Sequence, residues 1–211
     1  MTHLDGLYLV TPDTADTPRA LAEQVAQALS GGARLVQYRH KGSNRQLQRD
    51  QATAVLGICR AAGVPLVIND DVTLAAEIGA DGVHLGRDDG DPIAARRRLG
   101  ADAIIGVSCY DDLALARAAA QAGASYIAFG SFFPSATKPN AVRASPALLS
   151  AARDSLRIPA VAIGGITPQN GGLLITAGAR MLAVVTGVFA QPDLAAAARA
   201  YASLFVDGDP R

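Results

Sequence analysis

Several features are scarce or absent in this 211-residue sequence, and each absence excludes a class of protein. Two cysteines, Cys59 and Cys109, are too few for a disulfide framework, and their spacing fits no metal site. The formal net charge is zero, which excludes a broad basic surface for nucleic acid. No apolar run approaches the roughly 18 residues of a membrane helix, and no basic segment typical of a signal peptide opens the chain. We therefore expect a soluble, cytoplasmic protein with no nucleic-acid or membrane partner.

Lysine is much scarcer than arginine among the basic residues of this chain. Only Lys41 and Lys138 are lysines among 19 basic residues. Because arginine serves wherever a general surface cation is needed, these two positions are candidates for roles that need a compact ammonium group. The alternative is that both are surface residues without a function. Hydrophobic residues make up 50% of the chain, which is enough to form a core.

A repeated pattern predicts the fold: a turn of small residues, a short apolar run and then a polar residue. The runs are rich in β-branched residues and lack alternation, which is typical of parallel strands buried on both faces. They predict strands at 7–10, 35–37, 66–69, 82–85, 103–107, 126–129, 160–163 and 181–185. Stretches with helical spacing lie between them, for example at 19–30, 45–62, 111–122 and 193–204. The pattern predicts an α/β fold, a (β/α)8 TIM barrel forming one catalytic domain over 1–211, with a doubly wound open sheet as the alternative.

Polar side chains follow the second, third and fourth predicted strands, at the end of the barrel where active sites lie. Alternation along a strand points Gln37, Arg39 and Lys41 in the same direction, into the mouth of the barrel. Buried cations need an anion or acidic side chains opposite them. Asp70 and Asp89 follow the next two strands and offer the oxygen ligands that Mg²⁺ prefers. We therefore predict a magnesium site on these two carboxylates.

Two neighbouring residues are interpreted as structural. Asp71 precedes a predicted helix at 72–78 and is expected to be its N-cap. His84 lies on an apolar strand and is expected to be a core residue with satisfied hydrogen bonds. The three histidines show no metal-ligand spacing, and no Ser–His–Asp set is evident.

The later strands end in small residues. Strand 5 ends at Ser108, and strand 6 continues into a long loop at 130–139 that contains Lys138. The length of this loop and its lysine favour a functional flap over a simple connector. Gly165 after strand 7 and Thr186 after strand 8 fit the cradle of backbone N–H groups that binds phosphate in many such barrels.

These residues predict two anion sites. Arg39, Lys41 and Lys138, together with a metal ion on Asp70 and Asp89, provide enough positive charge for a diphosphate. The glycine cradle suits a single phosphate. Because no acid–base pair is evident, the arrangement favours a reaction driven by departure of diphosphate over one driven by proton abstraction.

The chain resembles the thiamine phosphate synthase family over nearly its whole length. Six motifs at strand ends carry this resemblance, and they occur in order: Gln37-x-Arg39-x-Lys41, Asn69-Asp70-Asp71, Gly82-Val83-His84-Leu85-Gly86-x-x-Asp89, Gly106-x-Ser108, Gly130…Pro134-Ser135-x-Thr137-Lys138 and Ala162-Ile163-Gly164-Gly165-Ile166. Each motif is weak alone, and the ordered set is specific.

The resemblance implies a transferase that joins 4-amino-2-methyl-5-hydroxymethylpyrimidine diphosphate to a thiazole phosphate with Mg²⁺, giving thiamine phosphate and diphosphate. It implies that the diphosphate is held by Arg39, Lys41, Asn69 and Lys138, with the metal on Asp70 and Asp89. It implies that Gln37 and Ser108 contact the aminopyrimidine. It implies a thiazole phosphate site made of Ser135, Thr137, Gly165, Val185 and Thr186. Catalytic roles fall on Arg39, Lys41, Ser108 and Lys138.

The chain departs from the family pattern at a few positions. Arg87 stands where glutamine is frequent, Cys109 and Tyr110 stand where a histidine is frequent nearby, and Ser135 replaces a common threonine. None of these changes removes a predicted phosphate or metal ligand. Two alternatives are a thiazole tautomerase on the same barrel and a non-catalytic, phosphate-sensing barrel. The carboxylates and Lys138 favour the synthase, and an outer helix face leaves room for a homo-oligomer.

Overall fold

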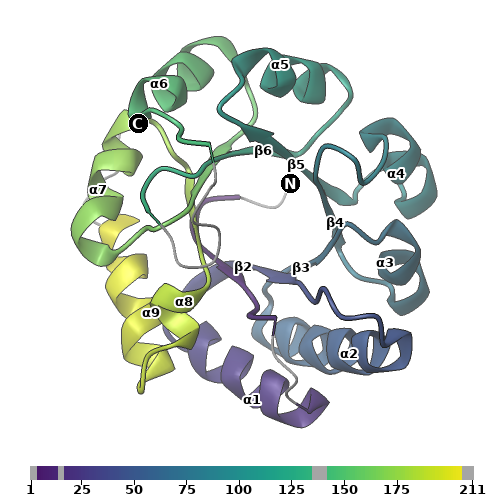
Figure 1. Ribbon diagram of the computed structural model, residues 1–211. Coiled ribbons are helices and arrows are strands. Elements are labelled where there is room, and N and C mark those ends of the chain that lie inside the picture. Colours follow the sequence, from purple (N-terminus) through teal and green to yellow (C-terminus); the bar gives the residue numbers. More distant parts are fainter. Residues whose placement is uncertain (1–3, 14–16, 135–141, 206–211) are drawn as a thin grey trace.

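The strands of the protein close into a parallel barrel. The computed structural model describes residues 4–13, 17–134 and 142–205. Within these residues each strand pairs with the next in the chain, and the last strand pairs with the first (Figure 1). The strands are β1 (Gly6–Val10), β2 (Ala33–Tyr38), β3 (Leu66–Asn69), β4 (Gly82–Leu85), β5 (Ile104–Tyr110), β6 (Tyr126–Phe129), β7 (Ala160–Ile163) and β8 (Met181–Val184). The predicted TIM barrel is confirmed, because an open sheet would leave β1 and β8 as unpaired edges.

Helices form a ring around the barrel (Figure 1). They are α1 (Pro18–Leu29), α2 (Arg45–Ala62), α3 (Val72–Ile78), α4 (Pro92–Leu99), α5 (Leu113–Gln121), α6 (Pro146–Ser155), α7 (Pro168–Ala177), α8 (Thr186–Phe189) and α9 (Leu194–Ala202), followed by the 3₁₀ turn η1 (Ser203–Phe205). The local sequence sets their ends. For example, the Asn44 side chain accepts the Leu47 N–H at 3.0 Å at the start of α2, and Gly63 ends that helix at φ 66°.

The core has two layers, which follow from the alternation of side chains along each strand. Tyr8 belongs to a cluster formed mainly by strand residues, including Leu35, Val67 and Met181, which fills the interior of the barrel. The next residue, Leu9, belongs to the cluster between the barrel and the surrounding helices. This outer layer explains why the strands are mainly apolar without strict alternation in the sequence: both faces of the sheet are buried.

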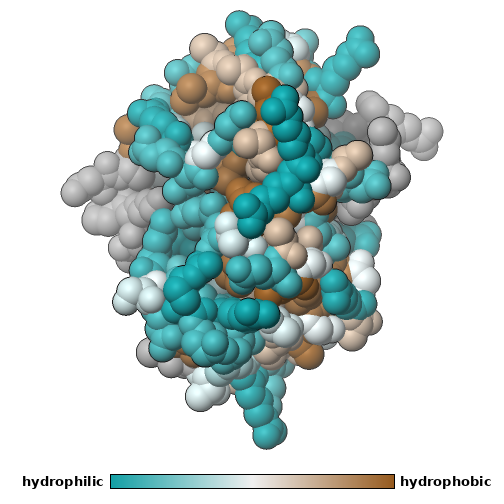
Figure 2. Space-filling model, turned by 90° about the vertical axis from the view of Figure 1, so that its right-hand side faces the viewer, coloured by the Kyte–Doolittle hydropathy of each residue, from teal (hydrophilic) through white to brown (hydrophobic). Residues whose placement is uncertain are grey.

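The outer face over α3 and α4 carries mainly hydrophilic side chains with smaller hydrophobic areas between them (Figure 2). In the described part of the chain, no helix is long and apolar enough to cross a membrane. Most predicted boundaries shift by one or two residues, and two of the changes bear on the site. Strand β5 continues to Tyr110, beyond the predicted end at 107–108, and β8 ends at Val184, with Thr186 as the first residue of α8. The single domain over 1–211 stays a prediction at its ends, because 1–3 and 206–211 lie outside the described residues.

Candidate active site

Three polar side chains lie at and just after the end of strand β2, at the mouth of the barrel. Gln37 is 5% exposed and points inward, whereas Arg39 and Lys41 lie just beyond the strand. The Lys41 ammonium donates to Asp70 Oδ2 at 2.9 Å, and the Arg39 guanidinium lies 3.8 Å from the Asp13 carboxylate. The backbone N–H of Lys41 also donates to Asp13 Oδ1 at 3.0 Å. Acidic side chains therefore face both cations, as the sequence predicts.

The end of strand β1 holds this segment in place, a role that the sequence analysis missed. The buried Thr11 hydroxyl accepts the Arg39 N–H at 2.9 Å and donates to the Arg39 carbonyl oxygen at 3.2 Å. Thr11 and Asp13 thus position the residues that follow β2. The signal was available, because both residues follow an apolar strand at the same end of the barrel as the predicted site.

Asp70 stands in an unusual backbone conformation at the end of β3. Its φ of 64° lies in the left-handed region, which costs free energy for a residue with a side chain and is best tolerated by asparagine and aspartate. The Asn69 amide donates to Asp70 Oδ2 at 2.6 Å, so the carboxylate receives N–H groups from both Asn69 and Lys41. Asp71 caps α3 by accepting the Leu74 N–H at 2.8 Å, which confirms its predicted structural role.

The Asp89 carboxylate faces Asp70 across the ends of β3 and β4. Desolvation raises the pKa of Asp89, and the nearby Asp70 carboxyl raises it further. The Gly86 N–H donates to Asp89 Oδ2 at 3.0 Å. Two facing carboxylates suit a divalent cation, because the cation would remove their mutual repulsion. Among the described residues no group of three or more His, Cys, Asp or Glu forms a metal cage, and Mg²⁺ typically needs only one or two carboxylates beside phosphate oxygens.

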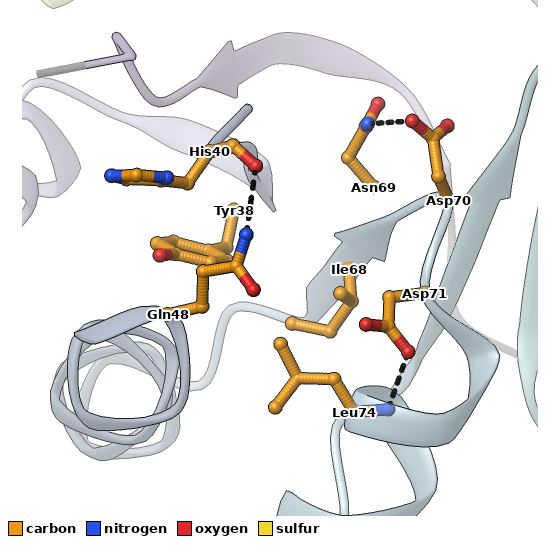
Figure 3. Close-up of a pocket in the computed structure, with 8 residues that line it drawn as sticks. All are labelled: Tyr38, His40, Gln48, Ile68, Asn69, Asp70, Asp71 and Leu74. Atoms are coloured by element: carbon orange, nitrogen blue, oxygen red, sulfur yellow. Dashed lines mark hydrogen bonds between the residues drawn. The ribbon is translucent and has the colours of Figure 1, made fainter. Parts of the chain in front are cut away.

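A small cavity of about 160 Å³ opens beside Asp70, between β2, β3 and the helices α2 and α3 (Figure 3). Asn69, Asp70 and Asp71 line one side of it, and Tyr38, His40 and Gln48 line the other. The Gln48 amide donates to the His40 carbonyl oxygen at 3.4 Å, which ties α2 to the segment after β2. The cavity therefore lies on the outer side of the segment after β2, which carries Arg39 and Lys41.

Gln37 and Ser108 both lie inside the barrel. The Gln37 amide donates to the Tyr8 hydroxyl, and Ser108 bonds to His84. His84 is 8% exposed, and both of its ring nitrogens have partners, which confirms the prediction of a satisfied interior histidine. Ser108, predicted at the end of strand 5, lies within β5, which continues to Tyr110.

The opposite side of the mouth is built from backbone. Gly165 has a φ of 62°, and a Cβ there would lie 2.3 Å from the Pro134 carbonyl oxygen. The Phe133 N–H donates to the Gly164 carbonyl oxygen at 3.0 Å, so the loop after β6 packs directly on the loop after β7. Only glycine fits at 165, both for its φ and for this close approach.

Two short connections complete this side. The Asn170 amide donates to the Gly165 carbonyl oxygen at 3.1 Å, and its oxygen accepts the Thr167 N–H at 2.8 Å at the start of α7. Val185 is the N-cap residue of α8, and Thr186 is the first residue of that helix. The first N–H groups of a helix have no acceptor within the helix, which makes them the kind of backbone donor that a phosphate can use.

Three predicted site residues, Ser135, Thr137 and Lys138, lie outside the described residues. The structure shows the surroundings of two departures from the family pattern. The Arg87 guanidinium lies 4.8 Å from the centre of the Tyr110 ring, which places it beside the mouth. Cys109 is buried, and burial raises the pKa of its thiol to about 12, so the thiol stays protonated and is a poor nucleophile.

A barrel whose strand ends carry two cations, facing carboxylates and a glycine turn is typical of enzymes that act on phosphorylated small molecules. A family model described as "Thiamine monophosphate synthase" matches residues 7–188. The chain belongs to this family. Its activity is that of a thiamine-phosphate synthase, a transferase of thiamine biosynthesis that releases diphosphate.

Individual relatives agree with this assignment over nearly the full chain. A thiamine-phosphate synthase of Azoarcus sp. is 56% identical over 200 residues, which cover 95% of this chain and 97% of the relative. One from Chromobacterium violaceum is 56% identical over 202 residues, covering 96% and 97%. The solved structure of a thiamine phosphate pyrophosphorylase from Pyrococcus furiosus superposes with a TM-score of 0.83 at 29% identity, covering 96% of each chain. The synthase is thus favoured over the tautomerase and the non-catalytic barrel.

Proposed function

We propose that the chain joins 4-amino-2-methyl-5-hydroxymethylpyrimidine diphosphate to a thiazole phosphate at the mouth of the barrel, and that Asp70 and Asp89 hold Mg²⁺ there. One observation carries this proposal: the Asp70 carboxylate lies beside the Asp89 carboxyl and accepts a hydrogen bond from the Lys41 ammonium at 2.9 Å. Such a cluster combines the two things a diphosphate needs, a cation from the protein and carboxylates for a metal ion. When bound, Mg²⁺ would neutralise charge that develops on the leaving diphosphate.

Arg39, Lys41 and Asn69 would bind the diphosphate oxygens, together with Lys138 from the loop after β6. The distance of 3.8 Å between the Arg39 guanidinium and the Asp13 carboxylate is too long for a hydrogen bond, and the Lys41 side chain is 55% exposed. Both cations can therefore turn toward an anion without breaking a buried contact. Each contact that strengthens as the diphosphate leaves is typically worth about 3–4 kcal/mol of the barrier.

The reaction follows from the electronic character of the pyrimidine. Its 4-amino group donates electron density to the ring, so the bond between the exocyclic carbon and the diphosphate oxygen can break early, with the electron pair leaving on diphosphate. The thiazole nitrogen then forms the new bond to that carbon with its lone pair. The protein must hold the two rings in line and stabilise the departing charge, and neither task requires a general base.

Each ring has its own side of the mouth in this proposal. Gln37 and Ser108 contact the aminopyrimidine from inside the barrel. The thiazole phosphate is held by backbone at Gly165, Val185 and Thr186, with the hydroxyls of Ser135 and Thr137 beside it. The positive φ of Gly165 and the open N–H groups at the start of α8 support this division.

Incubation with both substrates and Mg²⁺ tests the proposal directly. Equal amounts of diphosphate and thiamine phosphate should form together, and a chelator should stop both. Release of diphosphate without thiamine phosphate would show hydrolysis instead of transfer. Turnover that persists in the presence of the chelator would remove the metal from the proposal.

The early bond cleavage has its own test. An electron-withdrawing group on the pyrimidine should slow the chemical step strongly in single-turnover measurements, because it destabilises positive charge on the exocyclic carbon. A rate insensitive to this substituent would indicate direct displacement.

Self-association through the outer helices and a cytoplasmic location stay predictions, which sedimentation and fractionation can test.

A further inference from the structure

Five polar side chains from five strands form one continuous hydrogen-bonded chain through the interior of the barrel. The Gln37 amide donates to the Tyr8 hydroxyl at 2.5 Å, and the hydroxyls of Tyr8 and Tyr126 are 2.7 Å apart. His84 Nδ1 lies 2.9 Å from the Tyr126 hydroxyl, and His84 Nε2 lies 2.9 Å from Ser108 Oγ. The chain therefore joins the two residues that the proposed function assigns to the aminopyrimidine.

The surrounding packing holds these hydrogen-bonded side chains in one arrangement. The His84 and Tyr126 rings stack with centres 5.6 Å apart, and the Tyr8 ring meets Tyr126 edge-on at 5.8 Å. Gly106 makes the space, since a Cβ at that position would lie 2.1 Å from the Tyr126 ring and 2.6 Å from His84 Nδ1. Both tyrosines are at most 1% exposed. A buried polar chain of this kind is stable only when every member is satisfied.

The number of protons on these side chains determines which group donates in each hydrogen bond. Burial raises the pKa of Tyr8 and of Tyr126, so each phenol keeps its single proton. Because the Tyr8 oxygen accepts a hydrogen bond from Gln37, the Tyr8 hydroxyl donates to the Tyr126 oxygen. The Tyr126 hydroxyl then donates to His84 Nδ1. His84 therefore carries its proton on Nε2 and donates it to the Ser108 oxygen.

This direction determines what the two ends present to a ligand. One N–H of the Gln37 amide donates to Tyr8, which fixes the orientation of the amide and leaves its oxygen as an acceptor beside the second N–H. The Ser108 oxygen accepts a hydrogen bond from His84, so the Ser108 hydroxyl can donate its own proton to a ligand. A 4-aminopyrimidine offers an N–H group and a neighbouring ring nitrogen with a lone pair, which complement this acceptor and donor. A 4-oxopyrimidine offers the reverse pattern, a carbonyl oxygen and a ring N–H.

We infer that Tyr8, Tyr126 and His84 are positioning residues that act through Gln37 and Ser108, and that their directed chain makes the site select 4-aminopyrimidines over 4-oxopyrimidines. This inference rests on the proposed function. Mismatched buried hydrogen-bonding groups are strongly disfavoured, so discrimination of about 10²-fold or more is expected.

Competitive inhibition measures this selection without depending on the reactivity of the analogue. The probes are pyrimidinylmethyl phosphonates that cannot release diphosphate, one with a 4-amino group and one with a 4-oxo group. In the unmodified protein the amino compound should bind about 10²-fold more tightly. In Tyr126→Phe the ratio should fall at least about tenfold, because the His84 proton and the Gln37 amide are no longer fixed, while the KM for the thiazole phosphate stays the same.

Tyr38→Phe is the matched control. It lies next to Gln37 on β2 but points outward, where its hydroxyl donates to Gln51 Oε1 at 2.8 Å. It loses the same kind of buried bond and should keep the inhibitor ratio. If Tyr126→Phe does not fold, Tyr8→Phe breaks the chain one step earlier and should lower the ratio in the same direction. An unchanged ratio in the folded variant would overturn the inference.

Nitrogen-15 NMR of labelled histidine gives a readout independent of activity. The His84 signals, identified by their loss in His84→Gln, should show a neutral ring with the proton on Nε2, and Tyr126→Phe should shift them toward the other tautomer. A proton on Nδ1 in the unmodified protein would overturn the direction of the chain. If the unmodified protein made no thiamine phosphate, the proposed function would fail while the tautomer result would stand separately.

Discussion

The two sides of the barrel mouth present different chemical groups. The side after β2, β3 and β4 presents charged side chains, with Lys41 and Asp70 2.9 Å apart and Asp89 beside them. The side after β7 and β8 presents backbone, shaped by Gly165 at a φ of 62° and by the start of α8. In the proposed function, the leaving group that gains charge would meet adjustable charges, and the phosphate that stays unchanged would meet fixed dipoles.

This difference predicts different consequences of substitution on the two sides. Charges that respond to the reaction contribute mostly in the transition state, so their loss should lower kcat. A fixed backbone cradle binds substrate and transition state equally, so its distortion should raise KM. The following substitutions test this contrast in order of expected effect.

Asp70→Asn should have the largest effect. Asparagine tolerates the left-handed backbone at this position, so the change removes charge while keeping the conformation. Turnover should fall by about 10²–10³-fold, and the concentration of Mg²⁺ for half-maximal rate should rise. Initial rates measured over a range of Mg²⁺ concentrations check this.

The neighbouring residue supplies the control for that variant. Asp71→Asn changes the same chemical group one position along the chain, and asparagine is an equally good N-cap for α3. This variant should keep the Mg²⁺ dependence of the unmodified protein. Equal Mg²⁺ dependence in Asp70→Asn and the unmodified protein would be evidence against a metal on Asp70.

Lys138→Ala should follow, with a loss of turnover of about 10²-fold if its ammonium stabilises the departing diphosphate. This expectation rests on the scarcity of lysine, because residue 138 lies outside the described structure. Arg117→Ala, which removes an exposed cation from α5, is the control. Steady-state kinetics with both substrates saturating distinguish the two, and near-normal turnover in Lys138→Ala would make this lysine a general surface cation.

Gly165→Ala tests the backbone side. The new Cβ would meet the Pro134 carbonyl oxygen and would require a positive φ, so the turn must shift. The KM for the thiazole phosphate should rise at least about tenfold, with a smaller change in kcat. Gly172→Ala, within α7 and with open space around it, should leave this KM unchanged. A fall in kcat alone would contradict the division between the two sides.

The sequence predicted the features that depend on local pattern. The repeated turns and apolar runs gave the barrel, and the alternation at Gln37 and Tyr38 matches their opposite directions, with Gln37 bonded to Tyr8 inside and Tyr38 bonded to Gln51 outside. Asp71 was recognisable as a cap because helix capping is determined within a few residues.

Features that depend on the closed barrel could not be predicted in this way. Tyr8 and Tyr126 are 118 residues apart, and each stands in an apolar run that looks like ordinary core. Their hydroxyls meet only because barrel closure and register place both side chains in the interior at one level. The left-handed backbone of Asp70 is likewise a consequence of the loop's packing, which no residue pattern at the end of β3 indicates.

Gly57→Ala should have the smallest effect and sharpens the contrast between the mouth and the helical shell. Gly57 is exposed in the middle of α2, and nothing lies within 4 Å of a Cβ placed there. Alanine should raise the free energy of unfolding by about 0.5–1 kcal/mol, because it reduces the conformational freedom of the unfolded chain. Urea denaturation measures this gain, and both KM values should stay the same. A change in either KM would mean that α2 transmits strain to the segment after β2 through Gln48, whose amide donates to the His40 carbonyl oxygen.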